Sequence, residues 1–191
     1  MRIWHVVTAL AMLASGCAHE VTFDRPEHYA VAGPHEEATL TCVIDPQTLA
    51  MKVPINSFMT GAAHEWNVEP GDMLKQVAAI ELPQMFSHYD FATSSPAHAA
   101  QGRNVVLELS IPSYRFEDFH AKVAVAAKAY DGNHKRFLDK TYTAEGETQG
   151  AKMFWGGAFA MKSAIRQSSL EAYKKIFEQL RADLAAIVGH S

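Results

Sequence analysis

Histidine and acidic side chains are the residues of this sequence best suited to hold a metal ion. The 191 residues include 10 His and 21 Asp and Glu, and imidazole and carboxylate groups are common metal ligands. The histidines are dispersed, but His120 stands near two acids, Glu117 and Asp118. Residues two apart in a strand share a face, so Asp118 and His120 could point together while Glu117 could not. The pair is a candidate metal site, although the pattern favours a solvated hairpin end.

The familiar catalytic motifs are missing from the sequence. It has no G-x-S-x-G, G-x-x-x-x-G-K-[ST], G-x-G-x-x-G, C-x-x-C or H-E-x-x-H. Seventeen Lys and Arg against 21 Asp and Glu give a net charge of −4, which implies no general attraction to nucleic acid. We therefore expect neither an enzyme nor a protein that needs a cofactor. An exported enzyme without a recognisable motif remains a third possibility, after the two functions described at the end of this section.

Residues 1–16 have the pattern of a secretory signal peptide. Arg2 precedes an uncharged run, Val6–Ala14, and small residues follow it. The run is too short to be a permanent transmembrane helix, and no other segment approaches about 18 consecutive apolar residues. We expect export across a membrane and no transmembrane helix.

Cys17 follows the small residues directly, and the stretch Leu13-Ala14-Ser15-Gly16-Cys17 resembles the lipobox of bacterial lipoproteins. In that family the cysteine thiol carries diacylglycerol, the signal is cut before the cysteine, and the new amino group is acylated, with palmitate for example. The resemblance implies a membrane anchor at Cys17. An ordinary cleaved signal with a chance cysteine is the alternative.

The residue after Cys17 is Ala18 and not Asp. By the sorting rule of Gram-negative lipoproteins, the resemblance implies anchoring in the outer membrane, facing the periplasm. Residues 17–37 contain Pro, Gly and charged residues with little periodic pattern, so we expect a tether that spans on the order of 25 Å. Cys42 lies in an apolar run and is expected to be a buried, inert thiol. A Cys17–Cys42 disulfide is the competing possibility for an exported protein.

Residues 38–191 are expected to form a single α+β domain. The hydrophobic pattern predicts strands over 39–44, 49–59, 105–111, 121–130 and 135–145 and helices from about 72 and over 158–188. Asp131-Gly132 between two strands predicts a hairpin. Pro54 predicts an edge strand or a bulge, and Pro83 a kinked or shortened helix. The order β-β-α-β-β-β-α favours a two-layer fold with a mainly antiparallel sheet and two helices on one face.

An aromatic segment beside Gly156-Gly157 is the candidate partner-binding site. Its side chains, Phe154, Trp155 and Phe159, suit core packing, and if exposed they suit contact with lipid or a protein. The two glycines before the expected helix could also hold an anion at its N-terminus, although the apolar neighbours do not favour this.

The lipobox, the hairpin pattern around Asp131-Gly132 and the long helix containing Ala164-Ile165-Arg166-Gln167-Ser168 together resemble small outer-membrane lipoproteins. Auxiliary lipoproteins of envelope transport systems and the lipopolysaccharide-assembly lipoprotein are of this kind. The resemblance implies a non-enzymatic envelope lipoprotein that assists assembly or transport through a protein or lipid partner. A membrane-tethered periplasmic binder of a small ligand or metal is the alternative hypothesis.

Overall fold

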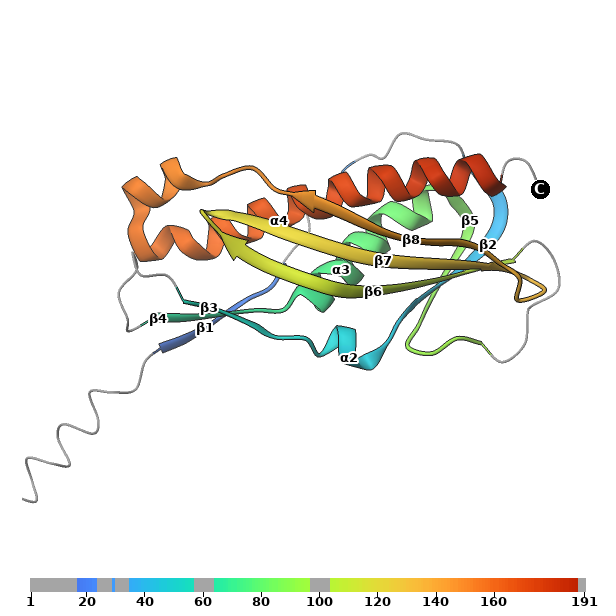
Figure 1. Cartoon of the computed structure of the whole chain (residues 1–191), viewed down its shortest axis with the longest axis horizontal. Helices are drawn as coiled ribbons and strands as arrows, with labels where there is room; N and C mark the ends of the chain where they lie inside the picture. The colour runs from blue at the N-terminus through green and yellow to red at the C-terminus, as the bar shows by residue number, and fades with distance from the viewer. Residues whose placement is uncertain (1–16, 24–28, 30–34, 57–63, 97–103, 189–191) are drawn as a thin grey trace, which may run out of the picture.

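A five-stranded sheet is the largest sheet in the computed structural model, which describes residues 17–23, 29, 35–56, 64–96 and 104–188 (Figure 1). Its strands are β2 (Glu36–Ile44), β5 (Phe86–Ala92), β6 (Asn104–Glu117), β7 (His120–Asp131) and β8 (Arg136–Glu145). The order across the sheet is β5-β2-β6-β7-β8. β2 runs parallel to both β5 and β6, whereas the β6–β7 and β7–β8 pairs are antiparallel. The sheet is therefore mixed.

The β7–β8 turn forms at the predicted Asp-Gly sequence. The Asp131 carboxylate accepts hydrogen bonds from the backbone N–H groups of Asn133 and Lys135, both at 2.9 Å. An Asp side chain that bonds to the backbone a few residues onward closes a tight turn. The predicted hairpin is confirmed.

A bulge allows Pro112 to lie within β6, in the part of the strand beyond Leu109 that pairs with β7 and no longer with β2. The register with β7 shifts between Ser110 and Ser113, so Pro112 owes no ladder hydrogen bond. The shift also changes the parity of the positions that face the core, which are Leu107, Leu109 and Ile111 before the bulge and Tyr114 beyond it.

A smaller sheet lies beside the first, with the order β1-β4-β3. Its strands are β1 (Cys17–Val21), β4 (His64–Val68) and β3 (Val53–Asn56). β1 runs parallel to β4, from the pair Cys17 and His64 onward, and β3 is antiparallel to β4. Pro54 lies in the edge strand β3, as predicted, where a missing N–H is tolerated.

Two expectations about the first half of the chain are wrong. Residues 17–37 do not form a tether throughout, because β1 pairs with β4, and Val21 and Phe23 are buried in the core. Residues 39–44 and 49–59 do not form a hairpin, because β2 and β3 lie in different sheets. The short helix α2 (Pro46–Leu49) separates them, capped by the Asp45 carboxylate at the N–H groups of Gln47 and Thr48.

Two longer helices cover one face of the five-stranded sheet. They are α3 (Pro70–Glu81), followed by the 3₁₀ turn η3 (Leu82–Gln84), and α4 (Gly150–Val188). α3 ends before Pro83, as predicted, and Phe86 and Tyr89, which continue the apolar spacing of this helix in the sequence, belong to strand β5. α4 begins eight residues earlier than expected, because the Gly-rich segment continues the helix.

The core lies between the sheet and these helices. From the sheet it takes Leu107, Val125 and Ala127, and from the helices Met73, Val77, Ile165, Tyr173 and Phe177, all of them buried. Gly146 lies so close to α4 that an added Cβ would lie 1.9 Å from the carbonyl oxygen of Ser168. The α+β class and the packing of helices on one face are confirmed. None of the described helices is long and apolar enough to cross a bilayer.

Candidate functional site

The face of the five-stranded sheet turned away from α3 and α4 is the candidate functional site. We call it the open face, and it comprises the outward residues of β2, β6, β7 and β8. These are Val43, Val106, Glu108, Ser110, Ala124, Ala126, Lys128, Tyr130, Asp139, Thr141 and Thr143. Successive side chains of a strand point to opposite faces, so the set that is not beneath the helices lies on the other face of the sheet. Two members of this set, Val43 and Val106, are nevertheless buried.

Charged residues alternate across one row of the open face. Glu108 of β6 pairs in register with Lys128 of β7, and Lys128 in turn with Asp139 of β8. The next row holds small residues. Ser110 of β6 pairs in register with Ala126 of β7, and Ala126 in turn with Thr141 of β8. These small side chains extend less far from the sheet than the charged side chains of the neighbouring row.

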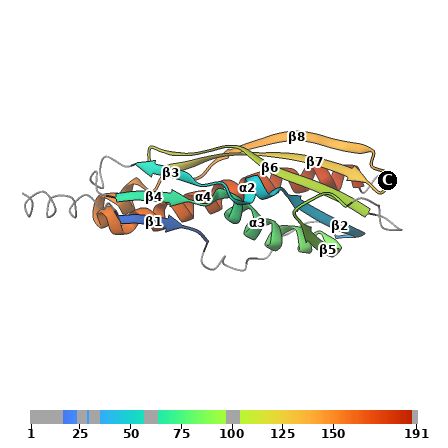
Figure 2. The same cartoon turned by 90° about the horizontal axis from the view of Figure 1, so that it is seen from below.

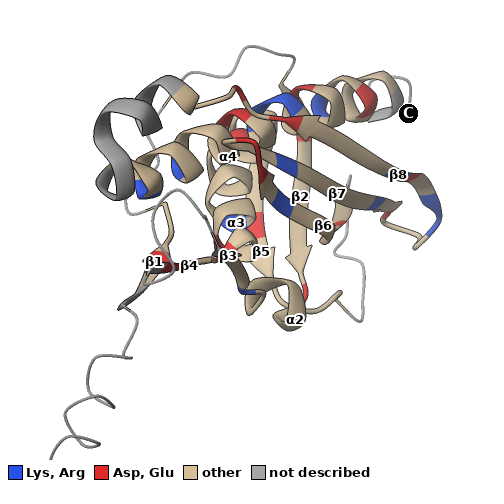
Figure 3. Ribbon diagram, turned by 60° about the vertical axis from the view of Figure 1, so that its left-hand side comes forward, with Lys and Arg blue, Asp and Glu red and all other residues tan. Residues whose placement is uncertain are grey.

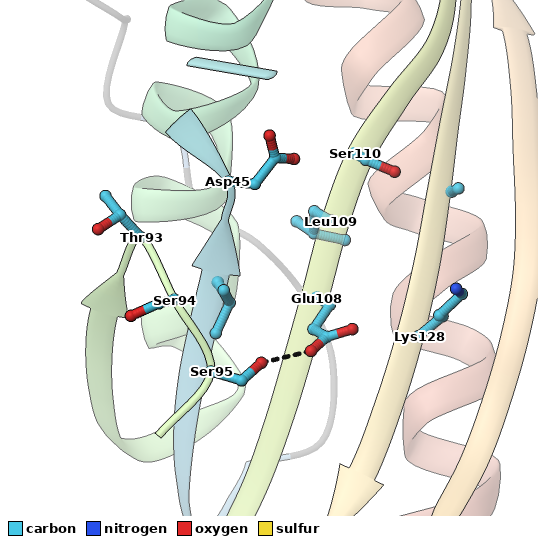
Figure 4. A pocket seen from close by; sticks show the side chains of 10 residues that line it. Asp45, Thr93, Ser94, Ser95, Glu108, Leu109, Ser110 and Lys128 are labelled. Carbon is cyan, nitrogen blue, oxygen red and sulfur yellow. Dashed lines mark hydrogen bonds between the residues drawn. The ribbon is translucent and has the colours of Figure 1, made fainter. Parts of the chain in front are cut away.

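A groove of about 300 Å³ opens beside Glu108, where the loop after β5 approaches the sheet (Figure 4). It is lined by Val43, Asp45, Thr93, Ser94, Ser95, Glu108, Leu109, Ser110, Ala126 and Lys128. Ser95 donates a hydrogen bond to one Glu108 oxygen, and the Tyr130 hydroxyl donates to the other at 3.3 Å. Burial raises the pKa of Tyr130, and the charge of Glu108 raises it further.

Two more hollows lie on the same face. One of about 220 Å³ adjoins the groove and includes Pro96, Tyr130 and His134. The other, of about 480 Å³, lies at the far end of β6 and β7 and includes Arg115 and Lys122. Hydroxyls both donate and accept hydrogen bonds, carboxylates accept and ammonium groups donate. The open face can therefore bind polar groups of either hydrogen-bonding character.

The metal-ligand candidates Asp118 and His120 are not brought together as paired ligands. Asp118 and Phe119 form the β6–β7 turn with positive φ values of 50° and 63°. His120 Nδ1 lies 3.2 Å from the backbone oxygen of Asp118, and its Nε2 lies 3.3 Å from the Glu145 carboxylate. Among the described residues, no three His, Cys, Asp or Glu side chains are grouped as a metal site requires.

The aromatic candidates cannot be compared with the structure in the same way. The backbone of 151–159 is helical, but the side chains of Phe154, Trp155 and Phe159 lie outside the described residues, so their role stays a prediction. Gly156-Gly157 lie inside α4 and not before it, which removes the suggested anion site at a helix N-terminus.

Cys42 is buried as expected, whereas the side chain of Cys17 lies outside the described residues. Cys42 is a free, fully buried thiol, and burial raises its pKa to about 12. Because the thiolate is the reactive form, Cys42 is inert near neutral pH. Cys17 is the first residue of β1, and its side chain lies outside the described residues.

A buried charged cluster between α3 and α4 escaped the sequence analysis. Only 2% of the Glu81 side chain is exposed, and it accepts a 2.7 Å hydrogen bond from the Tyr29 hydroxyl. Arg181 Nε lies 3.2 Å from its other oxygen, in the geometry of an ion pair rather than of a hydrogen bond. Burial raises the pKa of Glu81, and Arg181 opposes that shift. Lys174 lies over the Tyr29 ring, 4.0 Å from its centroid. The cluster fixes Tyr29 against the helices.

No family model and no curated protein matches this sequence. Solved structures that are similar to it include a Xanthomonas campestris protein of the DUF330 family, at 14% identity over 87% of this chain and 95% of the other, with a TM-score of 0.49. A hypothetical protein from Chlamydia trachomatis is 9% identical over 82% of this chain and 100% of its own, with a TM-score of 0.43.

A Helicobacter pylori protein described as a neuraminyllactose-binding hemagglutinin homolog is 13% identical over 90% of this chain and 97% of its own, with a TM-score of 0.37. At these levels of identity and superposition, the similarities assign neither a family nor a function.

Proposed function

We propose that this protein is a non-enzymatic lipoprotein of the bacterial cell envelope that assists assembly or transport by binding a partner protein on its open face. The observation that carries the proposal is the lipobox-like stretch Leu13-Ala14-Ser15-Gly16-Cys17. The residue that this stretch would mark for lipidation, Cys17, belongs to strand β1, which pairs with β4 in the folded domain. Acylation at this residue would leave the whole packed domain intact.

The open face supports the second half of the proposal. Its charged row, Glu108, Lys128 and Asp139, offers both signs of charge to a partner, and charge complementarity sets the register and specificity of an interface. Tyr130 adds an aromatic side chain beside the charges, and Tyr is enriched at protein interfaces. These features suit the open face to contact with a folded partner.

Labelling with radioactive palmitate in the producing bacterium tests the anchor. We expect the label to enter the wild-type protein and to be lost in Cys17→Ser. Cys42→Ala is the matched control, because its thiol is buried and should not be acylated. Equal labelling of wild type and Cys17→Ser would refute the lipoprotein proposal.

Photo-crosslinking in intact cells tests the partner. A photoreactive amino acid at Ala126, on the open face, should give one dominant adduct with another envelope protein. The same amino acid at Gln179, exposed on α4, is the control and should give little adduct. Equal adducts at both positions, or none at Ala126, would remove the open face from the proposal.

Binding of a small polar ligand in the groove beside Glu108 is a second candidate function. Ser95 and Tyr130 hold the Glu108 carboxylate in place, and Lys128 and Ser110 line the same groove. Such a mixture of donors and acceptors suits a neutral polyhydroxylated molecule. Titration with glucose and with N-acetylglucosamine, followed by NMR of the Ala126 and Lys128 amides, should show saturable shifts that Glu108→Ala abolishes.

A further inference from the structure

No flexible segment separates Cys17 from the folded domain. β1 is in register with β4 from its first residue, Cys17 beside His64 and Ala18 beside Glu65. Adjacent strands lie about 5 Å apart. A lipid attached at residue 17 would therefore be joined to a paired strand and not to a flexible segment.

β1 is also held firmly by the rest of the small sheet. Val21 is fully buried, and its carbonyl oxygen accepts a 3.2 Å hydrogen bond from the Glu69 N–H. Lys52 bridges Glu20 of β1, at 3.2 Å, and Glu69, at 2.8 Å. Pulling β1 away from the sheet would expose the buried apolar side chain and break these contacts.

The small sheet lies at one end of the molecule. Figures 1 and 2 both show β1, β3 and β4 at one end of the long axis and the β7–β8 turn at the opposite end. β7 has 12 residues and runs between these ends, so the turn at Asp131 lies about 36 Å from the His120 end of the same strand. The position of β1 therefore sets the direction of the whole molecule relative to its anchor.

We infer that the end of the small sheet at Cys17 rests in the headgroup layer of the membrane that carries the anchor, with the long axis of the domain directed away from it. This inference rests on the proposed lipidation of Cys17. This end of the small sheet contacts the lipid surface because acyl chains at Cys17 enter the bilayer within one residue of a hydrogen-bonded strand. The open face then extends from the membrane into the compartment, where a partner can reach it.

Fluorescence quenching in vesicles tests the position of the domain. The acylated full-length protein is purified from its producing bacterium, labelled with a thiol-reactive fluorophore at Glu65→Cys or at Asn133→Cys, and reconstituted in phosphatidylethanolamine–phosphatidylglycerol vesicles that contain a headgroup-attached nitroxide quencher. Both positions are exposed, and the buried thiol of Cys42 leaves the new cysteine as the site of labelling. We expect strong quenching at position 65 and little at position 133.

An insertion supplies the matched control. Twenty Gly and Ser residues between Cys17 and Ala18 should lift the domain by on the order of 25 Å and reduce quenching at position 65 several-fold. Equal quenching at position 65 with and without the insertion, or equal quenching at 65 and 133, would overturn the inference while palmitate labelling still upholds the anchor. If the wild-type protein neither incorporates palmitate nor floats with vesicles, the proposed function is overturned, and the inference with it.

Discussion

The two faces of the five-stranded sheet use the same strands for different purposes. In β7 the odd-numbered residues, such as Val125 and Ala127, are fully buried beneath the helices. The even-numbered residues between them, Ala126 and Lys128, lie on the open face (Figure 3 shows the charged residues of these strands). Burial removes apolar area from water and supplies stability, whereas we expect substitutions at exposed positions of the open face to change stability little.

The largest effect should follow from a cavity on the covered face. Leu107 is fully buried, and Leu107→Ala should lower the free energy of unfolding by about 3 kcal/mol, because lost burial and an unfilled cavity add together. Urea denaturation of the Cys17→Ser protein, which cannot be acylated at residue 17, measures the change. Thr141→Ala on the open face is the control, with an expected change within about 0.5 kcal/mol. Equal losses would abolish the distinction between the faces.

A buried hydrogen bond should give the next largest effect. The Ser168 hydroxyl of α4 accepts the N–H of Ala121 at 2.9 Å, and Ser168 is fully buried. Ser168→Ala leaves that N–H without its acceptor and should cost about 2 kcal/mol by urea denaturation. Ser163→Ala, an exposed position on the same helix, should leave stability nearly unchanged. If Ser168→Ala does not lower the free energy of unfolding, the helix must shift so that another group accepts the Ala121 N–H.

Acid should weaken one contact between β8 and α4. Lys140, at 2.7 Å, and the Tyr142 hydroxyl, at 2.6 Å, both donate to Asp183 and hold the pKa of its carboxyl below the usual value. The unfolded chain then binds the proton more readily, so stability rises with pH through the acidic range and is lost as pH falls below about 4.

Asp183→Asn should therefore cost less than about 1 kcal/mol near neutral pH, because the side chain is 34% exposed and its charge is screened. The difference from wild type should vanish in acid, as measured by urea denaturation at several pH values. Asp139→Asn, which breaks an exposed pair with Arg136, is the control. A loss that persists unchanged in acid would contradict the charge-based explanation.

The smallest effect on stability should accompany the largest effect on binding. Ala126→Arg places a bulky charge among the small residues of the open face and should change the free energy of unfolding by no more than about 0.5 kcal/mol. The crosslinked partner should nevertheless disappear when the photoreactive amino acid is placed at Ser110, opposite Ala126 in the register. A retained adduct would show that the partner binds elsewhere.

The strands of the second half of the chain could be predicted because their signals are local. Alternation in β6, β7 and β8 and the turn at Asp131 lie within short windows of sequence. β1, β4 and β5 escaped prediction because each has only five to seven residues and pairs in parallel or with a segment distant in sequence. A parallel partner leaves no turn signal between the two strands.

The candidate site was missed for a related reason. The row of Glu108, Lys128 and Asp139 comes from three strands, and only the register between them brings the charges side by side. The predicted candidates Asp118 and His120 do not belong to a group of three metal-ligand side chains among the described residues, and the contact between them is made by the backbone oxygen of Asp118 in a tight turn. Spacing within one strand could not reveal either arrangement.

The sequence by itself determined the α+β class, the main hairpin and the expectation of a lipidated Cys17, because propensity, periodicity and short motifs are properties of neighbouring residues. The tertiary structure decided that β1 joins the small sheet, that the helices cover one face, and that the open face collects its charges. These features depend on pairings between distant segments, whose free energy comes from burial and register and is not visible in any short stretch of sequence.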